Sequence, residues 1–102
     1  MIKVTVFKTN DLISKIEVKG HSGYANKGQD IVCAGVSAIT IGGLNAIHQL
    51  TGKIPEHVIE EDGYASIQFK TSKQEQLIAQ ICLIQLKSIA ESYKKYVKIT
   101  EK

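Results

Sequence analysis

The segment from Ile31 to Leu50 constrains the fold most, because it is apolar around most of a helical circumference. A strand of this length would be unusual, so the segment predicts a buried helix. Asp30 suits the N-cap of this helix, and Gly52 suits its C-terminal end. The adjacent glycines Gly42 and Gly43 each cost about 1 kcal/mol relative to alanine within a helix. We therefore expect another element to pack closely against them.

The N-terminal residues predict a β-hairpin. Apolar and polar residues alternate from residue 2 to residue 7, and again around Ile16 and Val18, as in strands with one buried face. Asn10 and Asp11 lie between the two runs and have suitable turn chemistry. Gly20 is expected to end the second strand.

A second hairpin and a second helix are predicted after Pro55. Val58 to Glu61 and Tyr64 to Lys70 flank Asp62-Gly63, a dipeptide suited to a two-residue type I′ turn. Ser72 and Glu75 have the spacing of a capping box, and apolar residues then recur at helical spacing up to Tyr93 or Tyr96. The lysine-rich stretch from Tyr93 to Lys98 is interpreted as the solvated end of this amphipathic helix.

These elements predict an α/β fold of the α+β type with the order ββαββα. We expect a two-layer single domain over residues 1–102, with a four-stranded, mainly antiparallel sheet and two helices on one face. No run of eighteen apolar residues occurs, and the first residues alternate unlike a signal-peptide core, so no membrane association is expected and the cytoplasm is the default location. The two cysteines are expected to be reduced thiols.

His21 and Cys33 form the candidate catalytic pair. His21 would follow the second strand, and Cys33 would lie in the first turn of the buried helix, where free backbone N–H groups and the helix dipole stabilise a thiolate. The loop between them contains Gly23 and Gly28 and is long enough to bring the imidazole back over the helix start. Cys82 lacks such surroundings and is interpreted as a packing residue.

This pair is suited to acyl transfer. Cys33 would attack a carbonyl carbon, N–H groups near the helix start would receive the oxyanion, and His21 would protonate the departing amine before water hydrolyses the thioester. Asp30 could orient His21 or cap the helix, and the capping role is favoured. Without substrate, the distance from His21 to the Cys33 sulfur is expected to exceed hydrogen-bond reach.

Three other functions remain open from the residues alone. The formal net charge of +3 and the lysine-rich end fit a non-catalytic ribosome-associated or RNA-binding module. Cys33 could instead be a redox-sensing thiol, although no resolving cysteine lies nearby in the sequence. A metal site is disfavoured because the chain lacks the close ligand pairs typical of zinc sites.

The pattern G-H-S-G-Y-A followed by G-x-D-I-V-C-A-G-V-S-A resembles the signature of the bacterial ribosomal-processing cysteine protease family, Prp. The resemblance extends in layout across essentially the full chain. It implies that His21 and Cys33 are the catalytic dyad. The candidate residues for substrate binding or support of the site are Gly20, Gly23, Tyr24, Gly28, Asp30, Ala34 and Ser37.

The resemblance also implies a substrate and an assembly. Members of this family remove a short N-terminal extension from a protein of the large ribosomal subunit, so the expected partner is the precursor of that protein. The resemblance further implies a homodimer, a loop from Gly23 to Gln29 that orders around the substrate, and no metal or organic cofactor. Direct nucleic-acid binding is not required by this function.

Overall fold

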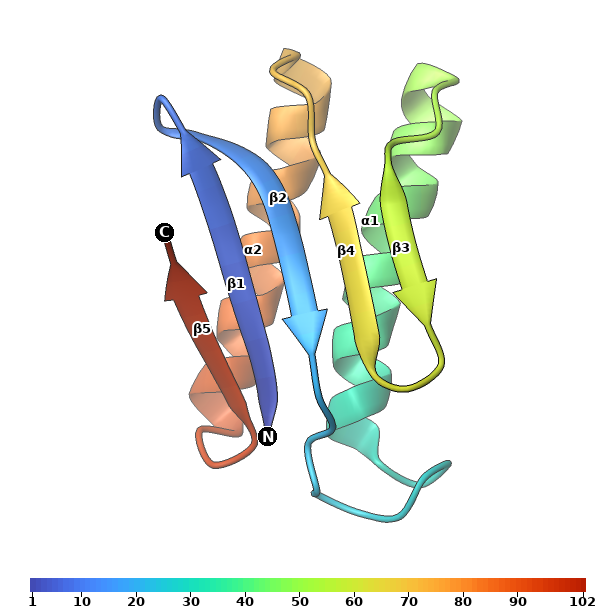
Figure 1. Ribbon diagram of the computed structural model, residues 1–102, viewed down its shortest axis with the longest axis vertical. Helices are drawn as coiled ribbons and strands as arrows, with labels where there is room; N and C mark the ends of the chain where they lie inside the picture. Colours follow the sequence, from blue (N-terminus) through green and yellow to red (C-terminus); the bar gives the residue numbers. More distant parts are fainter.

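The computed structural model describes residues 1–102 and contains one five-stranded sheet and two helices (Figure 1). The sheet has the strand order β3-β4-β2-β1-β5. The elements in chain order are β1 (Ile2–Thr9), β2 (Leu12–Lys19), α1 (Ile31–Thr51), β3 (His57–Glu60), β4 (Tyr64–Gln68), α2 (Lys73–Ser92) and β5 (Val97–Glu101).

The predicted first hairpin is confirmed. Strands β1 and β2 pair antiparallel, and Thr9 lies opposite Leu12. Asn10 and Asp11 form the two-residue connection with φ values of 52° and 65°. Positive φ at both central residues is the requirement of a type I′ turn, which asparagine and aspartate tolerate better than most residues.

The prediction of four strands was wrong, because the chain continues past α2 into a fifth strand. Helix α2 ends at Ser92, and the segment interpreted as its solvated end turns back at Tyr93 to Tyr96. Strand β5 then pairs parallel with β1, so the sheet is mixed. Val97 is 3% exposed. Its burial and the free hydrogen-bonding edge of β1 explain why this short lysine-flanked run is a strand.

The second hairpin is also present, but its turn differs from the prediction. Glu60 lies opposite Tyr64, so three residues, Glu61 to Gly63, form the connection instead of two. Gly63 has a φ of 85° and is the only one of the three in the left-handed region. Three-residue hairpin loops place a glycine at this last position.

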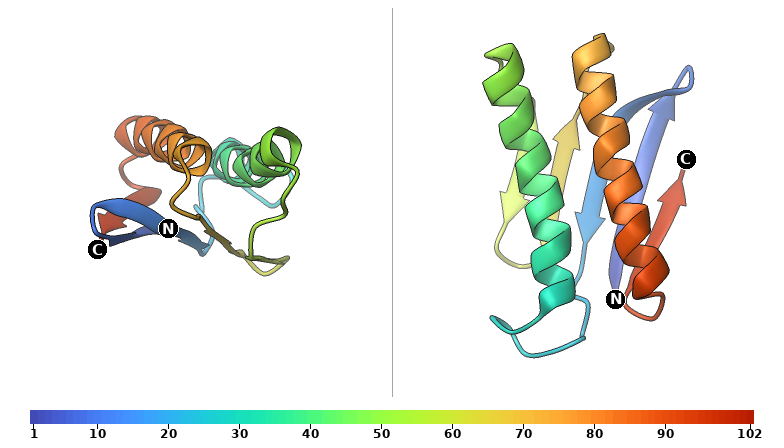
Figure 2. Two further views of the ribbon diagram at one scale, coloured as in Figure 1. Left: turned by 90° about the horizontal axis from the view of Figure 1, so that it is seen from above. Right: turned by 180° about the vertical axis from the view of Figure 1, so that it is seen from behind.

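Both helices pack on one face of the sheet, as predicted (Figure 2). A single cluster of 18 buried apolar residues lies between the two layers. The helices approach closely at Gly43, where a Cβ atom would lie 2.6 Å from the sulfur of Cys82. Helix α1 meets the length and composition of a membrane-spanning helix, criteria that the core helix of a soluble protein also meets.

Candidate active site

The loop between β2 and α1 leaves the sheet through a glycine. Gly20 has a φ of 94°, and a Cβ atom there would lie 2.6 Å from the carbonyl oxygen of Met1. Its N–H group donates a 2.8 Å hydrogen bond to the carbonyl of Gly63 in the β3–β4 turn. Only glycine satisfies both the backbone angle and the space. The chain that carries His21 is thereby attached to the β3–β4 turn.

Cys33 is the third residue of α1 and is half-buried. Its sulfur accepts a hydrogen bond from the backbone N–H of Ser22 at 3.4 Å and lies 3.6 Å from the Ser22 hydroxyl oxygen. A backbone N–H aimed at sulfur stabilises a thiolate as well as a thiol. The predicted position of Cys33 in the first helical turn is therefore confirmed, and Ser22 is an additional contact.

Asp30 is the N-cap of α1. Its Oδ1 accepts hydrogen bonds from the N–H groups of Val32 and Cys33 at 3.0 Å each. Its Oδ2 accepts from the Ser22 hydroxyl and from the N–H of Ala25 at 3.3 Å. Desolvation acts to raise the pKa of the Asp30 carboxyl, but these hydrogen bonds outweigh it and hold that pKa far below its usual range.

These four hydrogen bonds decide between the two roles considered for Asp30. The carboxylate caps the helix and closes the loop, and it makes no hydrogen bond to His21. The N–H groups of Val32 and Cys33 are also occupied by this cap. The expectation that amides at the helix start receive an oxyanion is therefore not met by these two groups.

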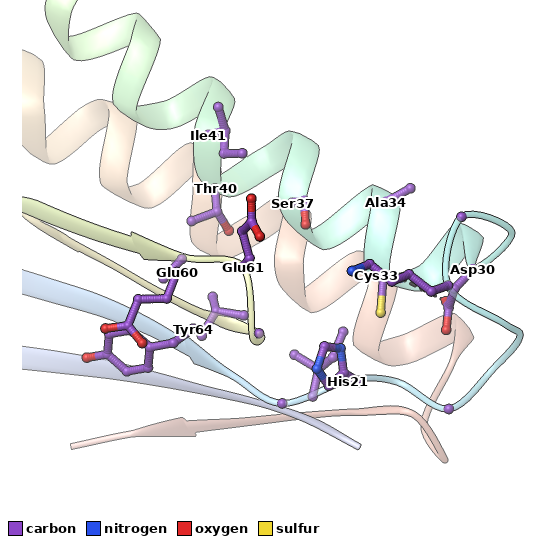
Figure 3. Close-up of a pocket in the computed structure, with 18 of the residues that line it drawn as sticks. His21, Asp30, Cys33, Ala34, Ser37, Thr40, Ile41, Glu60, Glu61 and Tyr64 are labelled. Carbon is purple, nitrogen blue, oxygen red and sulfur yellow. Dashed lines mark hydrogen bonds between the residues drawn. The ribbon is translucent and has the colours of Figure 1, made fainter.

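His21 is exposed and lies across the cleft from Cys33. The Cys33 sulfur points toward the imidazole ring (Figure 3), but no hydrogen bond joins the two side chains. The ring rests against the β3–β4 turn, since a Cβ atom on Gly63 would lie 2.9 Å from both Cε1 and Nε2 of His21. The expectation that the distance from His21 to the Cys33 sulfur exceeds hydrogen-bond reach without substrate stays a prediction.

The two side chains line one cleft of about 780 Å³. Helix α1 forms one wall, where Ala34, Ser37 and Ile41 follow one another at helical spacing (Figure 3). Strands β3 and β4 form the opposite wall, and their Ile59 is 49% exposed there. The cleft lies between α1, which packs mainly against α2, and strand β3, whose four residues are all exposed.

The sequence model of the family described as "Cysteine protease Prp" matches residues 1–98. The chain belongs to the Prp family of cysteine proteases. Curated relatives named "Ribosomal processing cysteine protease Prp" include a Bacillus subtilis protein, 35% identical over 98% of this chain and 96% of the relative. A Staphylococcus aureus relative of the same name is 33% identical over 88% of each chain.

Solved structures, including one of a Prp protein, have the same fold. The crystal structure of Staphylococcus aureus Prp with a covalently linked product peptide matches with a TM-score of 0.94 and 31% identity, covering all of both chains. A Streptococcus mutans protein matches with a TM-score of 0.87 and 25% identity, covering 99% of this chain and 93% of that one. The four-stranded, mainly antiparallel sheet expected from the sequence is thus replaced by the five-stranded mixed sheet of the Prp family.

Most of the predicted site residues of this Prp-family chain line the cleft. They are Gly20, His21, Gly23, Gly28, Asp30, Cys33, Ala34 and Ser37. Tyr24 is the exception. Its ring packs edge to face against Tyr93 and Tyr96, with centroid distances of 5.6 and 5.2 Å, and so attaches the loop to the end of α2.

The sequence did not indicate the wall formed by the second hairpin. Ile59, Glu60, Glu61 and Tyr64 line the cleft, although nothing in their local pattern distinguishes them from other strand and turn residues. Ser22 was not among the predicted site residues, and its contacts depend on the folded loop. Cys82 is a packing residue as expected, and burial raises the pKa of its thiol.

The site contains no cluster of three or more His, Cys, Asp or Glu side chains arranged to hold a metal ion. A thiol and an imidazole that face a common cleft are the two groups that nucleophilic acyl transfer by a cysteine uses. This chemistry is the one expected of a cysteine protease.

Proposed function

We propose that this chain is the endopeptidase that removes the N-terminal extension of a large-subunit ribosomal protein, and that residues 1–102 form its single catalytic domain. The observation that carries the proposal is the position of Cys33, half-buried at the start of α1 with its sulfur directed into the cleft opposite His21. Further support comes from the printed names of the Prp relatives.

In the proposed mechanism, the Cys33 thiolate attacks the carbonyl carbon of the scissile peptide bond. His21 takes the thiol proton and transfers it to the departing amine, which leaves a thioester on Cys33. His21 then accepts a proton from water as the water attacks the thioester, and the thiol is regenerated. Because His21 and Cys33 share no hydrogen bond in the structure, catalysis requires the imidazole to approach the sulfur.

The cleft suits an extended peptide with apolar side chains. Ala34 and Ile41 on α1 and Ile59 and Ala65 on the sheet give it two apolar walls. Peptide segments that occupy such clefts gain affinity from apolar burial, while a few polar groups fix their register. We expect the loop from Gly23 to Gln29 to order around this segment.

The experiment is a cleavage assay with a peptide that spans the extension and the first residues of the mature ribosomal protein. We expect cleavage by the native protein and by Cys82→Ala. Cys33→Ala should be inactive, and His21→Ala should lose about 10²- to 10⁴-fold in kcat/KM. Full cleavage by Cys33→Ala, or loss of cleavage in folded Cys82→Ala, would contradict the proposed nucleophile.

We further propose that the protein acts in the cytoplasm as a homodimer. Support for self-association comes from the outer face of the helical layer, where Leu77, Ile81 and Ile84 of α2 are 60%, 46% and 63% exposed. Exposed apolar faces of this kind are typical of interfaces. Sedimentation of Ile84→Lys should then show a monomer, whereas Thr100→Lys, with the same new charge on β5, should remain a dimer.

The alternative functions have less support. Of the three lysines in the lysine-rich end, Lys94 lies 3.5 Å from Glu91 in an ion pair, so the stretch is not uniformly basic. A redox function that forms an intramolecular disulfide would need a second thiol nearby, but the only other cysteine, Cys82, is buried between the helices. RNA binding that is unaffected by Cys33→Ala, together with failure to cleave, would favour the non-catalytic alternative.

A further inference from the structure

Ser22 lies between the proposed nucleophile and the helix cap. Ser22 is only 4% exposed. Its hydroxyl oxygen contacts three groups, which are Asp30 Oδ2, the N–H of Tyr24 at 3.1 Å and the sulfur of Cys33 at 3.6 Å. A hydroxyl has one hydrogen to donate and two lone pairs that accept. These three contacts therefore use its complete hydrogen-bonding capacity.

The direction of each hydrogen bond follows from the partners. The Asp30 carboxylate is ionised and only accepts, so the Ser22 hydroxyl hydrogen is donated to it. The N–H of Tyr24 only donates and takes one lone pair. The remaining lone pair of the Ser22 oxygen faces the Cys33 sulfur. Cys33 can form a hydrogen bond to this lone pair only by donating its S–H. The Ser22 hydroxyl thus interacts favourably with the thiol of Cys33 and unfavourably with its thiolate.

We propose that Ser22 is a positioning residue whose hydroxyl favours the protonated form of Cys33. The chain of hydrogen bonds runs from the Cys33 S–H to the Ser22 hydroxyl and from there to Asp30. Ionisation of Cys33 requires the Ser22 hydroxyl to move away or to give up its bond to Asp30. A hydrogen bond to the neutral form of an acid disfavours the charged form.

The backbone of Ser22 has the opposite effect, which makes the substitution informative. Its N–H donates to the sulfur at 3.4 Å and supports the thiolate. Ser22→Ala keeps this N–H and removes only the hydroxyl. The variant should therefore form the thiolate more readily than the native protein. This proposal rests on Cys33 being the proposed nucleophile, but its test does not require peptide cleavage.

The test measures the rate of Cys33 alkylation by iodoacetamide against pH in native protein, Ser22→Ala and Ser66→Ala. Ser66 is a buried serine of β4 that is 6% exposed and has no hydrogen bond to the loop, so it controls for loss of a buried hydroxyl. Peptide mapping assigns the modified cysteine, and circular dichroism with a thermal melt establishes that each variant is folded.

Several other titratable groups line the cleft and also influence how the Cys33 alkylation rate depends on pH. They are His21, Lys27, Asp30, Glu60, Glu61 and Tyr64. All of them are retained in Ser22→Ala, so the informative quantity is the ratio of variant to native rates at each pH. A net hydrogen bond of ordinary strength corresponds to a ratio of about 3 to 10 at pH 6.5.

The ratio should fall toward one as the pH rises and Cys33 ionises in both proteins. Ser66→Ala should follow the native profile throughout. A ratio of one or less at pH 6.5 would overturn the proposal. An acceleration by the same factor at every pH would also overturn it, because that result indicates a loosened loop. The proposed function fails separately, if Cys33→Ala still cleaves the ribosomal peptide.

Discussion

The adjacent glycines of α1 should respond in opposite ways to alanine. Gly42 has no atom within 4 Å of the place where its Cβ would lie, whereas the Cβ of an alanine at position 43 would lie 2.6 Å from the Cys82 sulfur. That separation is about 0.8 Å short of the 3.4 Å at which ordinary contact begins. Within a helix, alanine stabilises the folded state by about 1 kcal/mol relative to glycine. Overpacking in a core destabilises the folded state by about 1–3 kcal/mol.

Gly42→Ala should therefore raise the free energy of unfolding by about 0.5–1 kcal/mol, and Gly43→Ala should lower it by up to about 2 kcal/mol. For a domain of this size, 1 kcal/mol corresponds to about 4–8 °C in Tm. Urea unfolding and thermal melts measure both quantities. Repeating them at several protein concentrations separates effects on the fold from effects on self-association.

The expected loss of stability in Gly43→Ala comes from contact with one atom, the Cys82 sulfur, so one more substitution tests it. In a Cys82→Ala background the sulfur is absent, and Gly43→Ala should lose most of its penalty. Equal stability of Gly42→Ala and Gly43→Ala would refute the close approach of the helices. An unchanged Gly43→Ala penalty in the Cys82→Ala background would refute its assignment to the sulfur.

Three further predictions concern the loop and the two thiols. Because the pKa of the Asp30 carboxyl is lowered from its usual 3.8, its ionised form stabilises the fold above about pH 4 and this contribution is lost as the pH falls further. The difference in unfolding free energy between native protein and Asp30→Asn should accordingly shrink below pH 4, and a constant difference would argue against the cap. In folded native protein, iodoacetamide should modify Cys33 before Cys82, because burial raises the pKa of the Cys82 thiol. Both cysteines should react in denaturant. Equal rates in the folded state would contradict the burial of Cys82. Tyr24→Ala loses two edge-to-face contacts and should increase hydrogen exchange at the amides of residues 22–29, so unchanged exchange would show that the tyrosines do not restrain the loop.

Features encoded in local sequence could be predicted correctly. The cap at Asp30, the αL glycine at Gly52 and the Asn10-Asp11 turn each depend on residues that are neighbours in the chain. The position of Cys33 followed from the cap, because an N-cap at Asp30 fixes the third helical residue. The placement of His21 on the same cleft as this thiol required only a flexible loop of sufficient length.

Features that depend on tertiary contacts could not be predicted in this way. Strand β5 has five residues flanked by lysines, and it is stabilised by the free edge of β1, which lies far away in the sequence. The connection of the second hairpin is set by the pairing of Glu60 with Tyr64, so the Asp62-Gly63 dipeptide alone did not determine its length. The cleft wall at Ile59 forms because α1 packs mainly against α2 and not against β3.

Cys33, facing His21 across the cleft, is proposed to be the nucleophile of a protease. The most direct test of this role is covalent trapping with a substrate peptide that ends in a chloromethyl ketone, from which the attacking thiolate displaces chloride. Intact mass and peptide mapping should find one adduct on Cys33, slower labelling in His21→Ala and none in Cys33→Ala. An adduct on Cys82 instead, or equally fast labelling in His21→Ala, would contradict the claim.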